Sequence, residues 1–312
     1  MLVLTRAAYA QARHFLQTEA RPLERTLLKQ RFEAGPASAV VAEMTRFQNE
    51  DGGFGRALEP DLRTPSSSAL ATADALLLLH ELGIPADHPV VTRAVHYLLS
   101  TFDPFTHVWR VAPPDTNDHP HAPWWHDDGG SLARIFDGFL VIPRARIVSA
   151  LTHYAALVPA DWLEGLVGRT VADIETLPTL GSGGGDTLRY AIDLAETETL
   201  PVPYRQRLAA RVRAVVPGAV STDPAQWGTY VIVPLKLAPT PKSLAADLIA
   251  EAVQAHLDYL IQHQTTEGTW EPTWTWSGNY PDDWEQARGE WRGVLTLDAL
   301  TSLRAYGRID AG

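Results

Sequence analysis

Two stretches far apart in the chain follow one template. Residues 48–54 read QNEDGGF and residues 264–270 read QTTEGTW. Each contains Gln, two variable residues, an acid, Gly, one variable residue and a large aromatic residue. Each copy also comes directly after a segment with helical periodicity, over 35–48 and 243–264. A short element that recurs at helix ends predicts a repeated architectural unit in which each copy joins successive helices.

Helical periodicity dominates the rest of the chain. Residues 69–82, ALATADALLLLHEL, are apolar on nearly every side, which predicts a helix buried all round, started by Ser66–Ser68 and ended by Gly83. Strand signals are few, and Pro234 interrupts the one candidate strand, 228–237. The Gly-rich stretch 181–186 predicts a flexible connection. The sequence therefore predicts an all-α protein.

The template resembles the QW-type repeat of the terpenoid cyclase and protein prenyltransferase superfamily. The stretches 66–84 and 289–309 are similar to the inner helices of that superfamily, and the resemblance covers about 35–103 and 243–309. It implies a single α/α-toroid domain over 1–312, with about five or six pairs of inner and outer helices. Long loops near 103–142 and 265–285 are expected to carry function, because loops of this length in compact domains usually do.

The catalytic signatures of that superfamily are missing. Class II cyclases use Asp-x-Asp-Asp, and class I cyclases use Asp-Asp-x-x-Asp; the pairs at Asp127-Asp128 and Asp282-Asp283 fit neither pattern. The zinc site of the prenyltransferases needs a Cys, and this chain has none. The resemblance therefore implies the fold, while activity has to be argued from other residues.

Composition narrows the classes of partner. The net charge is −11 and no Lys/Arg-rich run occurs, which argues against nucleic-acid binding. The longest apolar run, 75–79, is too short for a transmembrane segment, and the start of the chain is a poor signal peptide. We expect a cytoplasmic protein with a small-molecule ligand.

The first candidate site is NDHPHAPWWHDDGG, residues 117–130. Three imidazoles beside carboxylates can bind Zn²⁺ or another divalent metal, so His119, His121 and His126 are candidate ligands; a rigid loop with backbone-bonded imidazoles is the structural alternative. A His–Asp pair can also perform acid–base catalysis, and adjacent tryptophans can form an apolar platform. The catalytic candidates are His126, Asp127 and Asp128, and the ligand-binding candidates are Trp124 and Trp125.

The second candidate site lies in residues 269–291. Trp274 and Trp276 alternate, so in an extended chain they share a face, and Tyr280 follows them. Asp282 and Asp283 are catalytic candidates, because paired acids beside aromatic platforms suit cleavage of glycosidic bonds. Helix capping by these acids is the structural alternative.

A third segment, 49–67, precedes the enclosed helix. Glu59 and Asp61 are candidate ligand-binding residues there, since the N-termini of inner helices in a toroid open toward one mouth of the cavity; surface solvation is the alternative.

Three functions remain open at this point. The first is a cyclase- or transferase-like protein that binds or transforms a small ligand, such as an isoprenoid, in an aromatic- and acid-lined cavity. The second is an intracellular carbohydrate-active enzyme of (α/α)6 type. The third is a non-catalytic scaffold. We favour an enzyme, with the reaction open and a divalent metal as the candidate cofactor.

Overall fold

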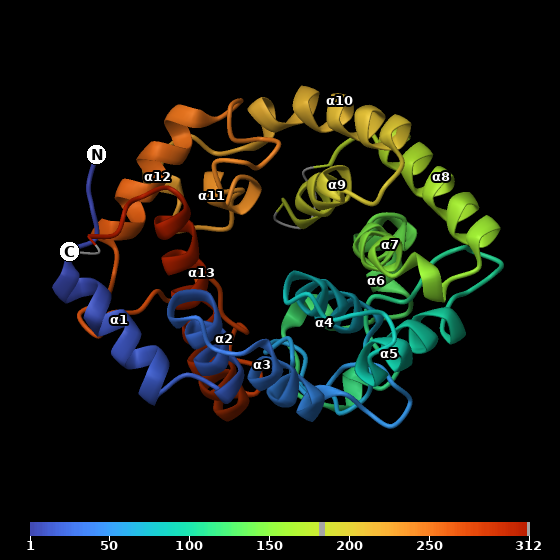
Figure 1. The fold of residues 1–312 in the computed structure, drawn as a ribbon, viewed down its shortest axis with the longest axis horizontal. Helices are drawn as coiled ribbons and strands as arrows, with labels where there is room; N and C mark the ends of the chain where they lie inside the picture. Colours follow the sequence, from blue (N-terminus) through green and yellow to red (C-terminus); the bar gives the residue numbers. More distant parts are fainter. Residues whose placement is uncertain (181–184, 311–312) are drawn as a thin grey trace. The chain divides into compact units, whose positions relative to one another are not determined.

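The computed structural model describes residues 1–180 and 185–310, so residues 181–184 of the Gly-rich stretch lie outside it. The described residues form helices joined by loops, with only isolated β-bridges and no β-strand, which confirms the all-α prediction (Figure 1). None of the described helices is long and apolar enough to cross a membrane. The α-helices are α1 (Arg6–Thr18), α2 (Pro22–Glu33), α3 (Ala37–Met44), α4 (Ala69–Glu81), α5 (Pro89–Ser100), α6 (Ser131–Ile135), α7 (Arg144–His153), α8 (Ala160–Thr176), α9 (Asp186–Glu196), α10 (Val202–Ala219), α11 (Pro234–Leu237), α12 (Ala250–Gln262) and α13 (Pro281–Ala305).

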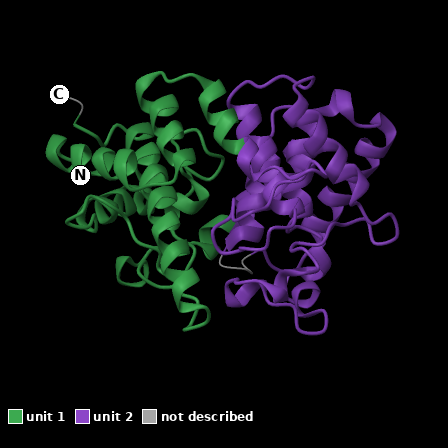
Figure 2. Ribbon diagram, turned by 90° about the horizontal axis from the view of Figure 1, so that it is seen from below, with its two compact units in different colours: residues 1–44, 216–312 green, residues 45–215 purple. Residues whose placement is uncertain are grey.

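The chain divides into two compact units, coloured separately in Figure 2. Unit 1 contains residues 1–44 and 216–312, and unit 2 contains residues 45–215. In unit 2, α4, α7 and α9 pack in succession, while α5 packs on α4 and α8 packs on α7. In unit 1, α13 packs on both α1 and α2, and α11 packs on α12. Each unit thus builds its own core from paired helices.

The enclosed helix matches its prediction. In α4 the buried residues lie on all sides, and the Ser68 hydroxyl caps the helix by accepting the N–H of Ala71. Gly83 follows the C-cap residue with φ +70°. The next helix also begins as its sequence suggests, with a capping His88 side chain before Pro89. Local capping chemistry therefore fixes this helix pair.

The one candidate strand is absent, and one predicted helix start was wrong. Residues 228–237 form no strand; Pro234 instead begins the short helix α11. The helix expected over 243–264 begins only at Ala250. Upstream of it, the Ser243 hydroxyl accepts the N–H of Thr240, and the Thr240 hydroxyl accepts the N–H of Lys242. These side-chain bonds compete with helical hydrogen bonding and hold the segment in turns.

The two template copies use the same hydrogen bonds. The Gln48 amide donates to the carbonyl of Gly52, at 2.9 Å, and to that of Val90 in the first turn of α5, at 3.0 Å. Gln264 donates to the carbonyls of Gly268, at 2.9 Å, and of Ala8 in the first turn of α1, at 3.1 Å. Each Gln therefore ties its own turn to the start of a neighbouring helix.

The aromatic ends of the copies are also equivalent. The N–H of Phe54 donates to the Thr72 hydroxyl on α4, and the N–H of Trp270 donates to the Thr296 hydroxyl on α13. Both aromatic side chains are buried. The acid position differs, because Asp51 accepts from the N–H of Gly53, whereas Glu267 pairs with an arginine of α13. The template is an architectural joint between helices in both units.

Candidate functional site

Two segments that the sequence marked separately lie against each other in unit 2. The N–H of Ala122 donates to the Asp61 carbonyl at 2.9 Å, and the N–H of Arg63 donates to the Pro120 carbonyl at 3.1 Å. Between these two contacts, Leu62 and His121 form an isolated antiparallel bridge. The loop that carries Glu59 and Asp61 is therefore braced against residues 117–130, the histidine loop, and the two form one region.

Two of the predicted histidines meet in this region. The His121 ring is buried, with 3% of the residue exposed. Its Nδ1 lies 2.6 Å from the carbonyl oxygen of His119, and its Nε2 lies 3.1 Å from Nδ1 of His126. The two ring planes differ by only 9°. Because His126 is exposed, the pair connects a buried ring to one that solvent or a ligand can reach.

The third histidine has a different partner. Nε2 of His119 lies 3.5 Å from Oδ2 of Asp115, and the same oxygen accepts from the hydroxyls of Ser66, at 2.7 Å, and Thr64, at 3.1 Å. Asp115 was not among the predicted site residues, because its hydroxyl partners lie 49 and 51 positions away in the sequence. The Asp115–His119 pair adds a second titratable pair to the region.

The described residues contain no group of three His, Asp or Glu side chains placed to hold a metal ion. His119 approaches Asp115, while His121 and His126 approach each other. The three imidazoles proposed as zinc ligands are thus divided between two contacts, and the predicted three-histidine centre is not assembled in this structure.

The two aspartates after His126 are hydrogen-bonded within their own loop. Asn117 bonds both the N–H and the C=O of Asp127, at 3.0 and 2.9 Å. The Asp127 carboxylate accepts the N–H of Leu132 in the first turn of α6 and lies 3.4 Å from Arg110. Asp128 is exposed, and its N–H donates to Ser131. The Asp127 carboxylate and the Asp128 backbone therefore help to shape the loop beside His126.

The tryptophans of this loop differ in exposure. Trp125 is 7% exposed and its ring packs on Phe136, with centroids 5.7 Å apart. Trp124 is only half-buried, so it is the one of the two that can offer a ring face to a ligand. Glu59 is half-buried as well, and Asp61 is buried.

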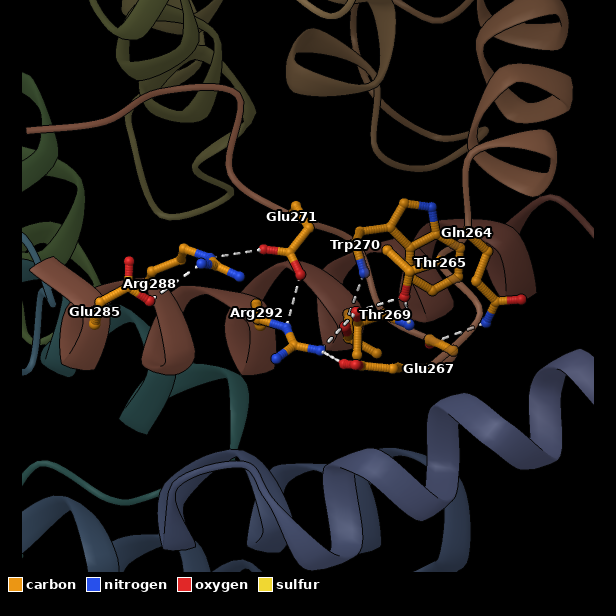
Figure 3. Close-up of polar contacts among 11 residues, drawn as sticks. Gln264, Thr265, Glu267, Thr269, Trp270, Glu271, Glu285, Arg288 and Arg292 are labelled. Carbon is orange, nitrogen blue, oxygen red and sulfur yellow. Dashed lines mark hydrogen bonds and ion pairs between the residues drawn. The ribbon is translucent and has the colours of Figure 1, made fainter. Parts of the chain in front are cut away.

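The second candidate site belongs to unit 1, where segment 267–276 runs along α13 (Figure 3). Trp274 packs edge-on against Trp291, at 5.1 Å, and Trp276 packs against Trp284, at 5.8 Å. The two α13 tryptophans are seven residues apart and so lie on one face of the helix. The rings of Trp274 and Trp276 both pack on this face of α13, so the side that they share is directed at the helix.

Ion pairs strengthen the same contact. Arg292 pairs with Glu267 and Glu271 of the segment, and Arg288 pairs with Glu271 of the segment and also, within α13 itself, with Glu285 (Figure 3). Because Trp276 is completely buried, it presents no ring face to a ligand in this structure. The segment acts as a strap on the helix.

The acids of this segment lie at a helix start. Asp282 and Asp283 are in the first turn of α13, where carboxylates interact favourably with the positive end of the helix dipole. Asp282 is exposed and Asp283 is half-buried. Tyr280, 39% exposed, precedes them with φ 45°. Tyr280 is the N-cap residue and no side chain in the described part of the chain caps α13, so the two acids favour the helix through its dipole and not as caps.

A charged cluster on three helices of unit 2 was not predicted. Arg146 of α7 lies between Asp74 of α4, at 2.6 Å, and Asp193 of α9, at 2.5 Å. Burial alone would lower the pKa of Arg146, but the two carboxylates outweigh it and hold that pKa above its ordinary value. Its guanidinium also lies over the Tyr190 ring. The three charged residues come from helices far apart in sequence, so no local sequence pattern predicts that they meet.

Comparison of the chain with protein-family models and with curated proteins gives no match.

Proposed function

We propose that this chain is an α/α-toroid protein, similar in architecture to the terpenoid cyclases and protein prenyltransferases, that binds a small hydroxylated ligand and transfers a proton at the histidine loop of unit 2. Sugars are the ligand class that we favour. The supporting observation is the contact between buried His121 and exposed His126 in a loop that is braced by the 61–63 segment. Acid–base catalysis needs such a positioned, accessible imidazole.

The toroid part of the proposal rests on the helix pairing. In unit 2, a row of three helices, α4, α7 and α9, is flanked by α5 and α8. The two template copies make equivalent bonds to neighbouring helices, as expected for one joint used repeatedly around a ring of helix pairs.

The charges on unit 2 favour a polar ligand over an isoprenoid. An isoprenoid needs an apolar, aromatic surface, whereas α4, α7 and α9 share the Asp74–Arg146–Asp193 cluster. The tryptophans of segment 267–276, which suggested such a surface in unit 1, pack on α13. Half-buried Trp124, two residues before His126 in the chain, suits stacking on the apolar face of a sugar ring.

Saturation-transfer NMR on the full chain tests the ligand class. The probes are glucose, N-acetylglucosamine and maltose, with farnesol as the apolar comparator. We expect saturation transfer to at least one sugar, and its loss in Trp124→Ala and in His126→Ala. His14→Ala is the matched control, since His14 is an exposed histidine of α1 in unit 1. Transfer to farnesol alone, or sugar binding that is indifferent to both site substitutions, contradicts the proposal.

A further inference from the structure

The His121–His126 contact has a geometry that distinguishes a hydrogen bond from a shared metal ion. The ring centroids are 5.3 Å apart and the facing nitrogens are 3.1 Å apart, so the centroid distance is longer by 2.2 Å. That difference is about twice the distance from the centre of an imidazole ring to one of its nitrogens. The two centroids and the two nitrogens therefore lie nearly on one line.

The ring planes are also nearly parallel, at 9°. Rings that are parallel and in line lie end to end in almost one plane, not face to face. In this arrangement the in-plane N–H of one ring points at the in-plane lone pair of the other, which is the geometry of a straight N–H···N hydrogen bond. Two nitrogens that shared a metal ion would instead aim their lone pairs at a common point to one side.

The carbonyl of His119 sets the direction of this bond. A carbonyl oxygen only accepts, so Nδ1 of His121, at 2.6 Å from it, carries the hydrogen. In the neutral ring Nε2 of His121 is then a lone-pair acceptor, and Nδ1 of His126 must donate to it. Neutral His126 is thereby held as the Nδ1–H tautomer, and its lone pair lies on Nε2.

We infer that Nε2 of His126 is the proton-accepting atom of the site and that His121 is a positioning residue that fixes its tautomer; this assignment rests on the proposed function. When a ligand hydroxyl is deprotonated, its proton moves to Nε2 of His126 and the electron pair of the O–H bond stays on the ligand oxygen. The resulting imidazolium keeps its Nδ1–H directed at Nε2 of His121. The positive charge forms beside an acceptor that is already in place, as in other oriented histidine bases.

Asp115 lies beside the imidazole of His119, as His121 lies beside that of His126. Its carboxylate lies 3.5 Å from Nε2 of His119, and two hydroxyls hold it there. The backbone carbonyl of His119 is also the acceptor for His121. The two histidine contacts are therefore linked through one residue, and the whole chain of bonds keeps the backbone of the site in register.

Long-range ¹H–¹⁵N correlation spectra of the unsubstituted full chain at neutral pH test the assignment. We expect His121 and His126 both to appear as Nδ1–H tautomers, whereas free histidine prefers Nε2–H and exposed His14 should follow it. An Nε2–H signal for His126 overturns the assignment, whether or not any sugar binds. If both histidines show the expected tautomers but the unsubstituted chain binds no sugar, the result contradicts the proposed function and leaves the tautomer assignment standing.

A substitution supplies the second measurement. In His121→Phe the ring shape is retained but the acceptor is lost, so His126 should revert to the Nε2–H tautomer. The matched substitution Phe136→Leu, at the C-terminal end of α6, should leave the Nδ1–H tautomer of His126 in place. Retention of the Nδ1–H tautomer in His121→Phe would show that another group sets it and would remove His121 from the positioning role.

Discussion

Single side chains in this protein carry bonds between elements far apart in sequence. Gln48 reaches a carbonyl 42 positions away and Gln264 reaches one 256 positions away, and each also closes its own turn. Both amide hydrogens of each side chain are therefore used. Because a carboxylate has no hydrogen to donate, Glu at either position would face two carbonyl oxygens with a negative charge. The sequence template thus reflects a requirement for two donors.

His256 allows a prediction at the residue scale. It is 5% exposed, lies against Trp227 and accepts the N–H of Leu235 on Nδ1. Burial lowers its pKa to about 4 in the folded protein, so the unfolded chain, with a pKa near the ordinary 6.5, binds the proton more readily. Stability should therefore fall as the pH decreases from about 6.5 to about 4, by about 3 kcal/mol from this group.

The pH dependence of the urea unfolding midpoint measures this effect. His256→Phe keeps a ring against Trp227 and removes the titration, so its midpoint should fall less between pH 7 and pH 5 than that of the unsubstituted protein. His153 also has a pKa lowered to about 4, by burial and by the charge of His80, and remains in both proteins. Equal slopes for the two proteins would show that protonation of His256 does not oppose folding.

At the scale of elements, the template glycines bring helices into close contact. Gly52 has φ +92°, and a Cβ at that position would lie 2.5 Å from the Arg93 carbonyl oxygen on α5. Gly268 has φ +84°, and its Cβ would lie 2.7 Å from the backbone N of Ala12 on α1. Gly83 shares a positive φ, +70°, but a Cβ there meets nothing within 4 Å. A comparison of Gly83 with Gly52 therefore separates the cost of a positive φ from the cost of the close contact with a neighbouring helix.

We therefore expect Gly83→Ala to cost about 1–2 kcal/mol of unfolding free energy, from the positive φ alone. Gly52→Ala should cost about 1–3 kcal/mol more, because a backbone atom of α5 has to move. Urea denaturation followed by circular dichroism measures both. Similar midpoints for the two variants would mean that the template turn does not hold α5 closely.

The elements also show which features a sequence can predict. The limits of α4 follow from a serine cap and a glycine within a few positions, and such local chemistry is visible in the sequence. The late start of α12 depends on hydroxyl–backbone bonds that compete with helix formation. Asp115 and Arg146 were missed because their partners are brought close only by the packing of distant segments. Local signals predict helices, whereas long-range ion pairs need the fold.

At the scale of the whole molecule, unit 1 is assembled from both ends of the chain. Leu4 and Ile309 form a parallel bridge, and Leu4 exchanges backbone hydrogen bonds with Arg308 and Asp310, at 2.8 and 2.9 Å. Buried Arg308 also donates to the Leu2 carbonyl and pairs with Asp258 of α12. The N-terminal helices α1 and α2 therefore pack on α13 in the same unit as the end of the chain.

This arrangement predicts that the order of the chain can be changed while unit 1 is kept. A permutant would begin at Pro36, run to Gly312, continue through a flexible linker of about six residues, and end with residues 1–35. The new chain ends of the permutant fall in the exposed turn between α2 and α3, where Ala34 has φ 54°. Because Leu4 and Asp310 are hydrogen-bonded, a short linker can join the old ends without strain.

The matched control is the truncated chain 36–312, which has the same new start but lacks α1 and α2. We expect the permutant to keep the helical circular dichroism and a cooperative unfolding transition close to those of the parent chain. The truncation should lose the transition of unit 1, since α13 loses both helices that pack on it and Arg308 loses the Leu2 carbonyl. If the permutant unfolds as the truncation does, the order of the segments matters to unit 1 as well as their contacts.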